Sequence, residues 1–154
     1  AFECAPGDPV SLWGTVSFTG PQKSIDAAAV SVAAGDGEAK PAGVVGRSIP
    51  GGALPGQTEV IDGATGVSLL NSWVKLWGRV TYAAEGYCYV DDGSGLDYGS
   101  GHAGIRVVFV DPTQLLAPDM IVSVWGIVEA EETGGVWRPV LRQVGMSDLE
   151  LHKW

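Results

Sequence analysis

The sequence predicts an all-β protein, and three observations carry that prediction. Glycine (23 residues) and proline (9) are abundant among the 154 residues, which favours short strands joined by turns over long helices. Hydrophobic residues make up 45% of the chain, enough to bury a core. A strand-like phrase, V-x-[LV]-W-G-x-V, occurs three times, as VSLWGTVSF (10–18), VKLWGRVTY (74–82) and VSVWGIVEA (122–130). Only DPTQLLAPDM (111–120) has room for a helical turn or two.

The second half of the chain reads as consecutive strands. In residues 74–82 apolar residues alternate with Lys75, Trp77, Arg79 and Thr81, so one face of the strand is apolar. Turns at AAEG, DDGSG and EETGG and the longer DPTQLLAPD segment separate the later strands. The strands are predicted at 74–82, 87–90, 104–110, 121–130 and 136–144, with a short edge strand in the tail DLELHKW.

Five strands with a longer connection between the third and fourth predict a five-stranded OB-like Greek-key barrel over residues 73–154. A glycine inside the first and fourth strands permits the sharp bend that closes a small barrel. The segments VKLWGRVTY, YCYVDDGSGL, GIRVVFV and VSVWGIVEA together resemble the OB-fold modules of large secreted bacterial proteins. The resemblance covers residues 72–154, and the YVDDGSG turn followed by GIRV is its most specific part.

The first part of the chain resembles only a fragment of such a module. GDPVSLWGTVSF matches APDMIVSVWGIV, and SIDAAAVSV stands in the place of VWRPVLRQV, so residues 1–34 are predicted to be a partial OB-like β-hairpin unit. Residues 35–72 are rich in glycine and proline and are similar to the connectors between consecutive modules of such proteins. We expect this connector to pack on the barrel through Val44, Ile49, Leu54, Val60, Ile61 and Leu69.

The three repeated tryptophans alternate with the apolar residues, so Trp13, Trp77 and Trp125 are expected on the outer face of their strands. Exposed tryptophan could stack on sugar rings or nucleobases, or contact a protein. Alternatively, the connector or neighbouring strands cover them and form a second small core. The residues predicted to make assembly contacts are Val10, Trp13, Val16, Phe18, Trp77 and Trp125.

The two cysteines leave two alternatives open. Cys4 and Cys88 form either one disulfide that pins the N-terminus to a strand or two free thiols. The aspartates of DDGSGLDYGSGH raise a weaker question of calcium binding, because clustered carboxylates suit that ion. Asp91, Asp92 and Asp97 do not have EF-hand spacing, and the alternative is a tight turn in which Asp91 or Asp92 accepts backbone amides. We expect no metal and no cofactor.

Charge and motifs argue against several functions. The net charge of −9 disfavours a phosphate backbone as a partner, and beside the aromatic Tyr87 and Tyr89 only Arg79 and Arg106 are basic, so single-stranded nucleic acid is the weakest of the alternatives. No apolar run is long enough to span a membrane. No catalytic motif surrounds His102 or His152, and we expect no enzyme activity.

An orphan hairpin beside a complete barrel suggests a function. Two apolar-faced strands without a barrel of their own form an edge that binds other strands. The resulting hypothesis is an extracellular, non-catalytic structural subunit, with its signal peptide removed, that binds copies of itself head-to-tail by hairpin complementation and can extend into a filament. The alternative is a monomeric carbohydrate-binding accessory module of a larger secreted protein, with exposed tryptophans that bind glycans.

Overall fold

The computed structural model describes residues 4–5, 7–19, 22–35, 38–55, 57, 61 and 63–152, without the side chains of residues 18–19 and 22–23. The predicted all-β fold is confirmed, since the described residues contain strands and a single 3-10 turn but no α-helix. The chain divides into two compact units, Ala1–Lys40 and Pro41–Trp154.

The first unit is built on one antiparallel hairpin, β1 (Val10–Thr19) and β2 (Gln22–Val32). The register of this hairpin differs from the one implied by aligning SIDAAAVSV (24–32) with VWRPVLRQV (136–144) of the same chain. Ile127 pairs with Arg142 in the barrel, yet the equivalent Thr15 pairs with Asp26 and not with Val30. The reason is that pairing in the first hairpin ends at Thr19, whereas the barrel hairpin continues two positions further, to a turn of two glycines with positive φ.

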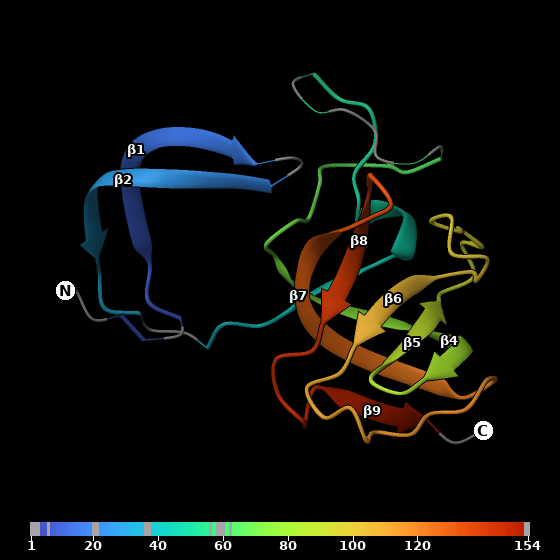
Figure 1. Cartoon of the computed structure of the whole chain (residues 1–154). Helices are drawn as coiled ribbons and strands as arrows, with labels where there is room; N and C mark the ends of the chain where they lie inside the picture. Colours follow the sequence, from blue (N-terminus) through green and yellow to red (C-terminus); the bar gives the residue numbers. More distant parts are fainter. Residues whose placement is uncertain are drawn as a thin grey trace. The chain divides into compact units, whose positions relative to one another are not determined.

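Five strands of the second unit close the predicted OB-like barrel (Figure 1). Going around the barrel, β4 is followed by β5, β6, β8 and β7, and β7 pairs again with β4. The pair β6–β8 is parallel and the other four pairs are antiparallel. The strands are β4 (Trp73–Ala84), β5 (Tyr87–Asp91), β6 (Ile105–Val108), β7 (Ile121–Thr133) and β8 (Val136–Arg142).

Two short strands extend the barrel sheet at its ends. β9 (Leu149–His152) pairs antiparallel with β7 and lies in the tail where an edge strand was predicted. β3 (Ala42–Val44) pairs parallel with β4 and was not predicted, and a 3-10 turn, η1 (Gly46–Ser48), follows it. The connection 111–120, expected to have room for helix, forms only turns.

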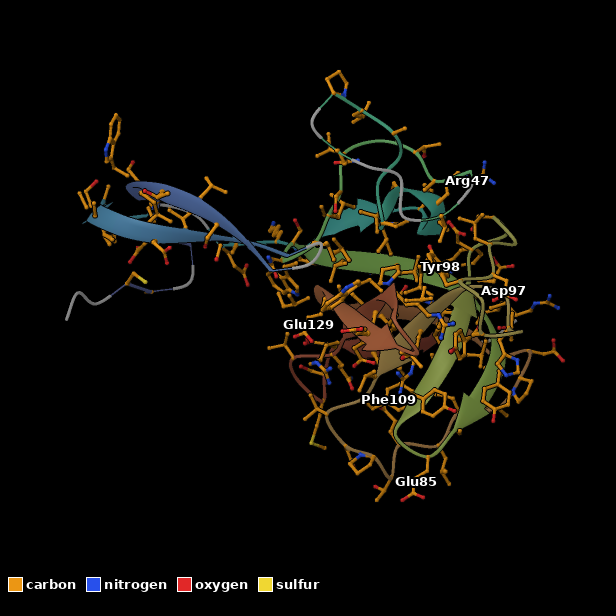
Figure 2. The ribbon with its side chains drawn as sticks, turned by 45° about the horizontal axis from the view of Figure 1, so that its top comes forward. Arg47, Glu85, Asp97, Tyr98, Phe109 and Glu129 are labelled. Atoms are coloured by element: carbon orange, nitrogen blue, oxygen red, sulfur yellow. The ribbon has the colours of Figure 1, made fainter. Side chains whose placement is uncertain are left out.

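The barrel core is formed by the inward residues of all five strands together with part of the connector. Tyr98 and Phe109, labelled in Figure 2, are nearly fully buried in it. Of the predicted connector anchors, Ile49 is fully buried, and Val44, Ile61 and Leu69 pack against the core. Leu54 is 42% exposed, so its prediction as an anchor was wrong, and Val60 lies outside the described residues.

Close backbone contacts explain the glycine of the repeated W-G phrase. A Cβ on Gly14, Gly78 or Gly126 would lie 2.2, 2.5 or 2.3 Å from a carbonyl oxygen of the neighbouring strand. Such distances are far below van der Waals contact, so only glycine allows the two backbones to approach this closely. In all three copies, including the N-terminal hairpin, glycine is needed because the neighbouring backbone leaves no room for a Cβ atom.

Candidate functional site

The hairpin of the first unit presents an apolar face that is open to solvent. Val10, Leu12 and Val16 alternate along β1, and Ile25 and Val30 lie opposite Val16 and Leu12 on β2. Leu12 and Val16 are each 50% exposed, and none of the buried hydrophobic residues of the described chain lies before Ile49. In β4 and β7 the equivalent positions are fully buried in the barrel. The apolar face of the hairpin therefore has residues typical of a protein core but is exposed to solvent.

The three repeated tryptophans have different surroundings. Trp13 is 79% exposed on the other face of β1. Trp125 is partly buried, with the ammonium group of Lys75 at 4.3 Å from the centre of its ring. Trp77 is 49% exposed and borders an open groove of about 510 Å³, here called the Trp77 groove. Phe18, the remaining predicted contact residue, has a side chain outside the described part. The Trp77 groove is lined by Gly43, Val44, Val45, Ser48, Lys75 and Trp77.

An aromatic cluster covers part of the outer surface of the barrel, and sequence reasoning did not find it as a group. The ring of His102 stacks on Tyr82 at 4.0 Å between centroids, and Tyr89 contacts both rings in tilted or edge geometry. Arg106 lies over the ring of Tyr87 at 4.6 Å. The pKa of Tyr82 is raised, mainly by charge repulsion from Tyr87 and secondly by the hydrogen bond between the two tyrosines. The ring faces of Tyr82 and Tyr87 are thus already in contact with neighbours.

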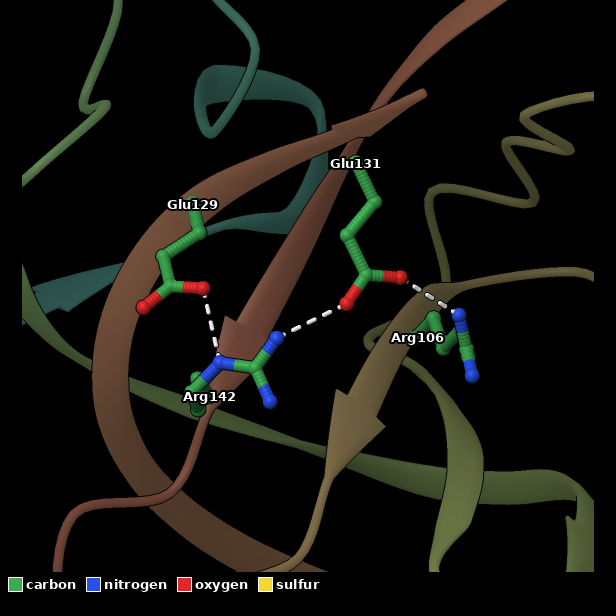
Figure 3. A network of polar contacts seen from close by, with 4 residues as sticks. All are labelled: Arg106, Glu129, Glu131 and Arg142. Atoms are coloured by element: carbon green, nitrogen blue, oxygen red, sulfur yellow. Dashed lines mark hydrogen bonds and ion pairs between the residues drawn. The ribbon is translucent and has the colours of Figure 1, made fainter. Parts of the chain in front are cut away.

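A ladder of ion pairs runs beside this cluster (Figure 3). Glu131 accepts hydrogen bonds from Arg106 at 2.7 Å and from Arg142 at 2.8 Å, and Arg142 also donates to Glu129 at 2.7 Å. The hydrogen bond to Glu129 is the main reason that the pKa of Arg142 is raised. Arg79 is paired with Asp119 in the same way. A phosphate backbone would have to compete with these carboxylates for the guanidinium groups, which is unfavourable for nucleic acid.

The three aspartates proposed as weak calcium candidates accept hydrogen bonds from the chain itself. Asp91 accepts the amide of Gly95 at 2.9 Å, and Asp97 accepts the amide of Ser100 at 2.8 Å. Asp92 accepts the amide of Gly46 at 2.7 Å and so ties the connector to the end of β5. Within the described residues no group of three or more His, Cys, Asp or Glu side chains is arranged to hold a metal ion. These carboxylates are turn and tether residues.

The tether through Asp92 predicts a loss of stability in acid. Burial alone would raise the pKa of Asp92, but hydrogen bonds from Ser94 and Gly46 outweigh it, so the pKa lies below its ordinary value. The stabilisation is therefore present above the unfolded pKa of about 3.9 and is lost as the pH falls through the lower folded value. Asp92→Asn should cost about 1 kcal/mol at pH 7. Urea unfolding at pH 7, 4 and 2.5 should show the difference shrinking in acid.

The control for this experiment is Glu85→Gln, at the exposed turn between β4 and β5. A stability difference between wild type and Asp92→Asn that is the same at pH 2.5 as at pH 7 would contradict the role of the Asp92 charge.

The two cysteines are free thiols in the structure, so the disulfide alternative is not what the structure shows. Cys88 is fully buried in the barrel core, and this burial raises the pKa of its thiol to about 12. Cys4 belongs to the other unit and is exposed. Cys88 therefore packs as a small hydrophobic residue, and its buried, protonated thiol is unreactive toward oxidation.

No protein-family model matches the chain, and no curated protein matches it significantly. Among the described residues there is also no helix with the length and apolar character needed to cross a membrane.

Proposed function

We propose that this protein is a non-catalytic structural subunit, secreted from bacteria, that assembles with copies of itself through its N-terminal hairpin. The observation that carries the proposal is the exposed apolar face of the hairpin, whose β1 residues Val10, Leu12 and Val16 have fully buried equivalents in β4 and β7. The likeness of residues 72–154 to modules of large secreted bacterial proteins supports the extracellular location.

The stability of the hairpin supports a need for a partner. A two-stranded sheet is at best marginally stable alone in water, because it cannot bury enough apolar surface. The described part of residues 1–40 contributes no buried hydrophobic side chain. Covering Leu12, Val16 and Ile25 with another apolar surface would provide the burial that the first unit lacks.

The Trp77 groove is the surface on a neighbouring copy that fits this face. It exposes the apolar side chains of Val45 and Trp77 beside β3, which ends the barrel sheet. The hairpin contributes an apolar surface to this contact, because its exposed Asp26 pairs with Thr15 and lies on the other face. Because hairpin and groove are different surfaces, repeated contacts of this kind run head-to-tail and build a filament unless they close into a ring.

Analytical ultracentrifugation of the full chain tests the proposal. Wild type should form species larger than a monomer as its concentration rises. Val16→Asp places a charge on the apolar face and should require at least about tenfold more protein for the same degree of association. Ser31→Asp, on the opposite face of the hairpin, is the matched control and should assemble as wild type does. Wild type that remains a monomer at the highest soluble concentration would overturn the proposal.

A second candidate function is glycan binding, which the exposed ring of Trp77 in its groove favours. An open tryptophan face beside the polar side chains of Ser48 and Lys75 is suited to stack on a sugar ring. Binding on a glycan array that is lost in Trp77→Ala with the fold intact, together with wild type that stays monomeric in the ultracentrifuge, would favour this function over assembly. Array binding that is unchanged in Trp77→Ala would exclude the groove as a glycan site.

A further inference from the structure

The three W-G strands of this chain do not have equivalent partners. In the barrel, β4 and β7 lie side by side and pair antiparallel, so two copies of the W-G phrase are each other's neighbours. The third copy, β1, pairs with β2 alone in a two-stranded sheet of the described residues. The edge of β1 that corresponds to the β4–β7 contact is therefore without a strand partner in that sheet.

The backbone groups on this edge are the ones that β4 and β7 use. The carbonyl of Pro9 accepts the amide of Ala33, so the odd residues of β1 face β2. Strand alternation places the N–H and C=O groups of the even residues on the other edge. In β7, the equivalent of Val16 is Val128, which donates to Ser72 and accepts from Asn71 on the β4 side. The even positions of the phrase thus face the neighbouring W-G strand in both cases.

The register of β4 against β7 is symmetric about the middle of the phrase. Leu76 pairs with Val124, and both correspond to Leu12 of β1. On either side, Gly78 pairs with Val122 and Val74 with Gly126, which correspond to Gly14 and Val10. Transferred to two copies of β1, this register places Leu12 opposite Leu12 and Val10 opposite Gly14, with a two-fold axis at Leu12.

We propose that β1 pairs antiparallel with β1 of a second copy of this chain, with Leu12 on the two-fold axis. This inference rests on the proposed self-assembly and names one of its contacts. Three residue pairs would each exchange two backbone hydrogen bonds across the axis. Pro9, which lacks an N–H, meets Thr15 of the second copy at a position where no donor is required.

The paired hairpins form one continuous four-stranded sheet. Three or more strands with an apolar face are stable where a lone hairpin is not, and the pairing covers an otherwise open backbone edge. The contact is isologous, so it closes with two copies. The head-to-tail contact uses the apolar face of the hairpin and the Trp77 groove, so the two contacts are compatible and together would extend an assembly.

Engineered disulfide crosslinking of the full chain tests the register. In a Cys4→Ser background the remaining native thiol, Cys88, is fully buried. Leu12→Cys and Val16→Cys are matched, because both native side chains are 50% exposed on the same face of the same strand. Opposite residues of a hydrogen-bonded antiparallel pair have Cα atoms about 5.5 Å apart, which suits a disulfide. The two Val16 positions would be separated by about 27 Å along the strands.

With oxidised glutathione, Leu12→Cys should form a covalent dimer at least about tenfold faster than Val16→Cys. Equal rates, or no dimer of Leu12→Cys while wild type associates in the ultracentrifuge, would overturn the register and leave self-assembly standing. Wild type that stays monomeric would overturn both. Thermal melting of each reduced variant checks that the barrel, whose buried hydrophobic residues all lie at Ile49 or beyond, remains folded.

Discussion

Gly126→Ala is expected to destabilise the barrel by about 2–3 kcal/mol, the upper part of the range for forcing an extra methyl group into a packed interior. The added Cβ would lie 2.3 Å from the carbonyl oxygen and 2.7 Å from the carbonyl carbon of Arg142. Both are backbone atoms of the paired strand β8, so no side-chain rotation relieves the contact. Relief requires β7 and β8 to separate at the point where the barrel bends. Urea unfolding followed by tryptophan fluorescence measures the change.

Gly43→Ala provides a matched control for the same measurement. Gly43 also lies in a strand, has no positive φ, and an added Cβ there would meet no atom within 4 Å. Its unfolding free energy should differ from wild type by less than about 0.5 kcal/mol, as for other surface substitutions. If both variants lose the same stability, the close approach of β7 and β8 is not the reason for glycine in the W-G phrase.

The strands could be predicted because their pattern is local. Alternation of apolar and polar residues marks β4 and β7 directly, and turn residues such as those of DDGSG mark where strands end. β3 could not be found in this way, because three residues in a Gly/Pro-rich segment contain no period. It exists because Ala42–Val44 lies along an edge of β4 that no other strand of the described residues covers there.

The apolar face of the hairpin could be predicted from the sequence, whereas the aromatic cluster could not. Val10, Leu12 and Val16 follow one another along a single strand, so their shared face could be predicted from alternation. Tyr82 and His102 are twenty positions apart and meet only because β4 and β5 are paired and the loop after β5 returns over them. Without the register of the strands, no sequence pattern brings these two rings together.

Ile49→Ala should cost about 2–4 kcal/mol, although Ile49 belongs to the Gly/Pro-rich segment that was predicted to be a connector. Its side chain is fully buried in the same cluster as the inward residues of β4, β7 and β8. The segment is held there by Tyr98, whose hydroxyl donates to the carbonyl of Gly46, and by Asp92, which accepts the amide of Gly46. Removing three carbons from this position leaves a cavity, and the two hydrogen bonds at Gly46 hinder the segment from moving in to fill it.

Val67→Ala is the control for Ile49→Ala, because Val67 lies in the same segment and is 67% exposed. Its unfolding free energy should stay within about 0.5 kcal/mol of wild type. If Ile49→Ala were as mild as Val67→Ala, the segment after Lys40 would be a detachable linker and the barrel would be complete from β4 onward. A loss confined to Ile49→Ala instead means that Ile49 is part of the barrel core, so a barrel cut at residue 73 would expose the core surface that Ile49 covers.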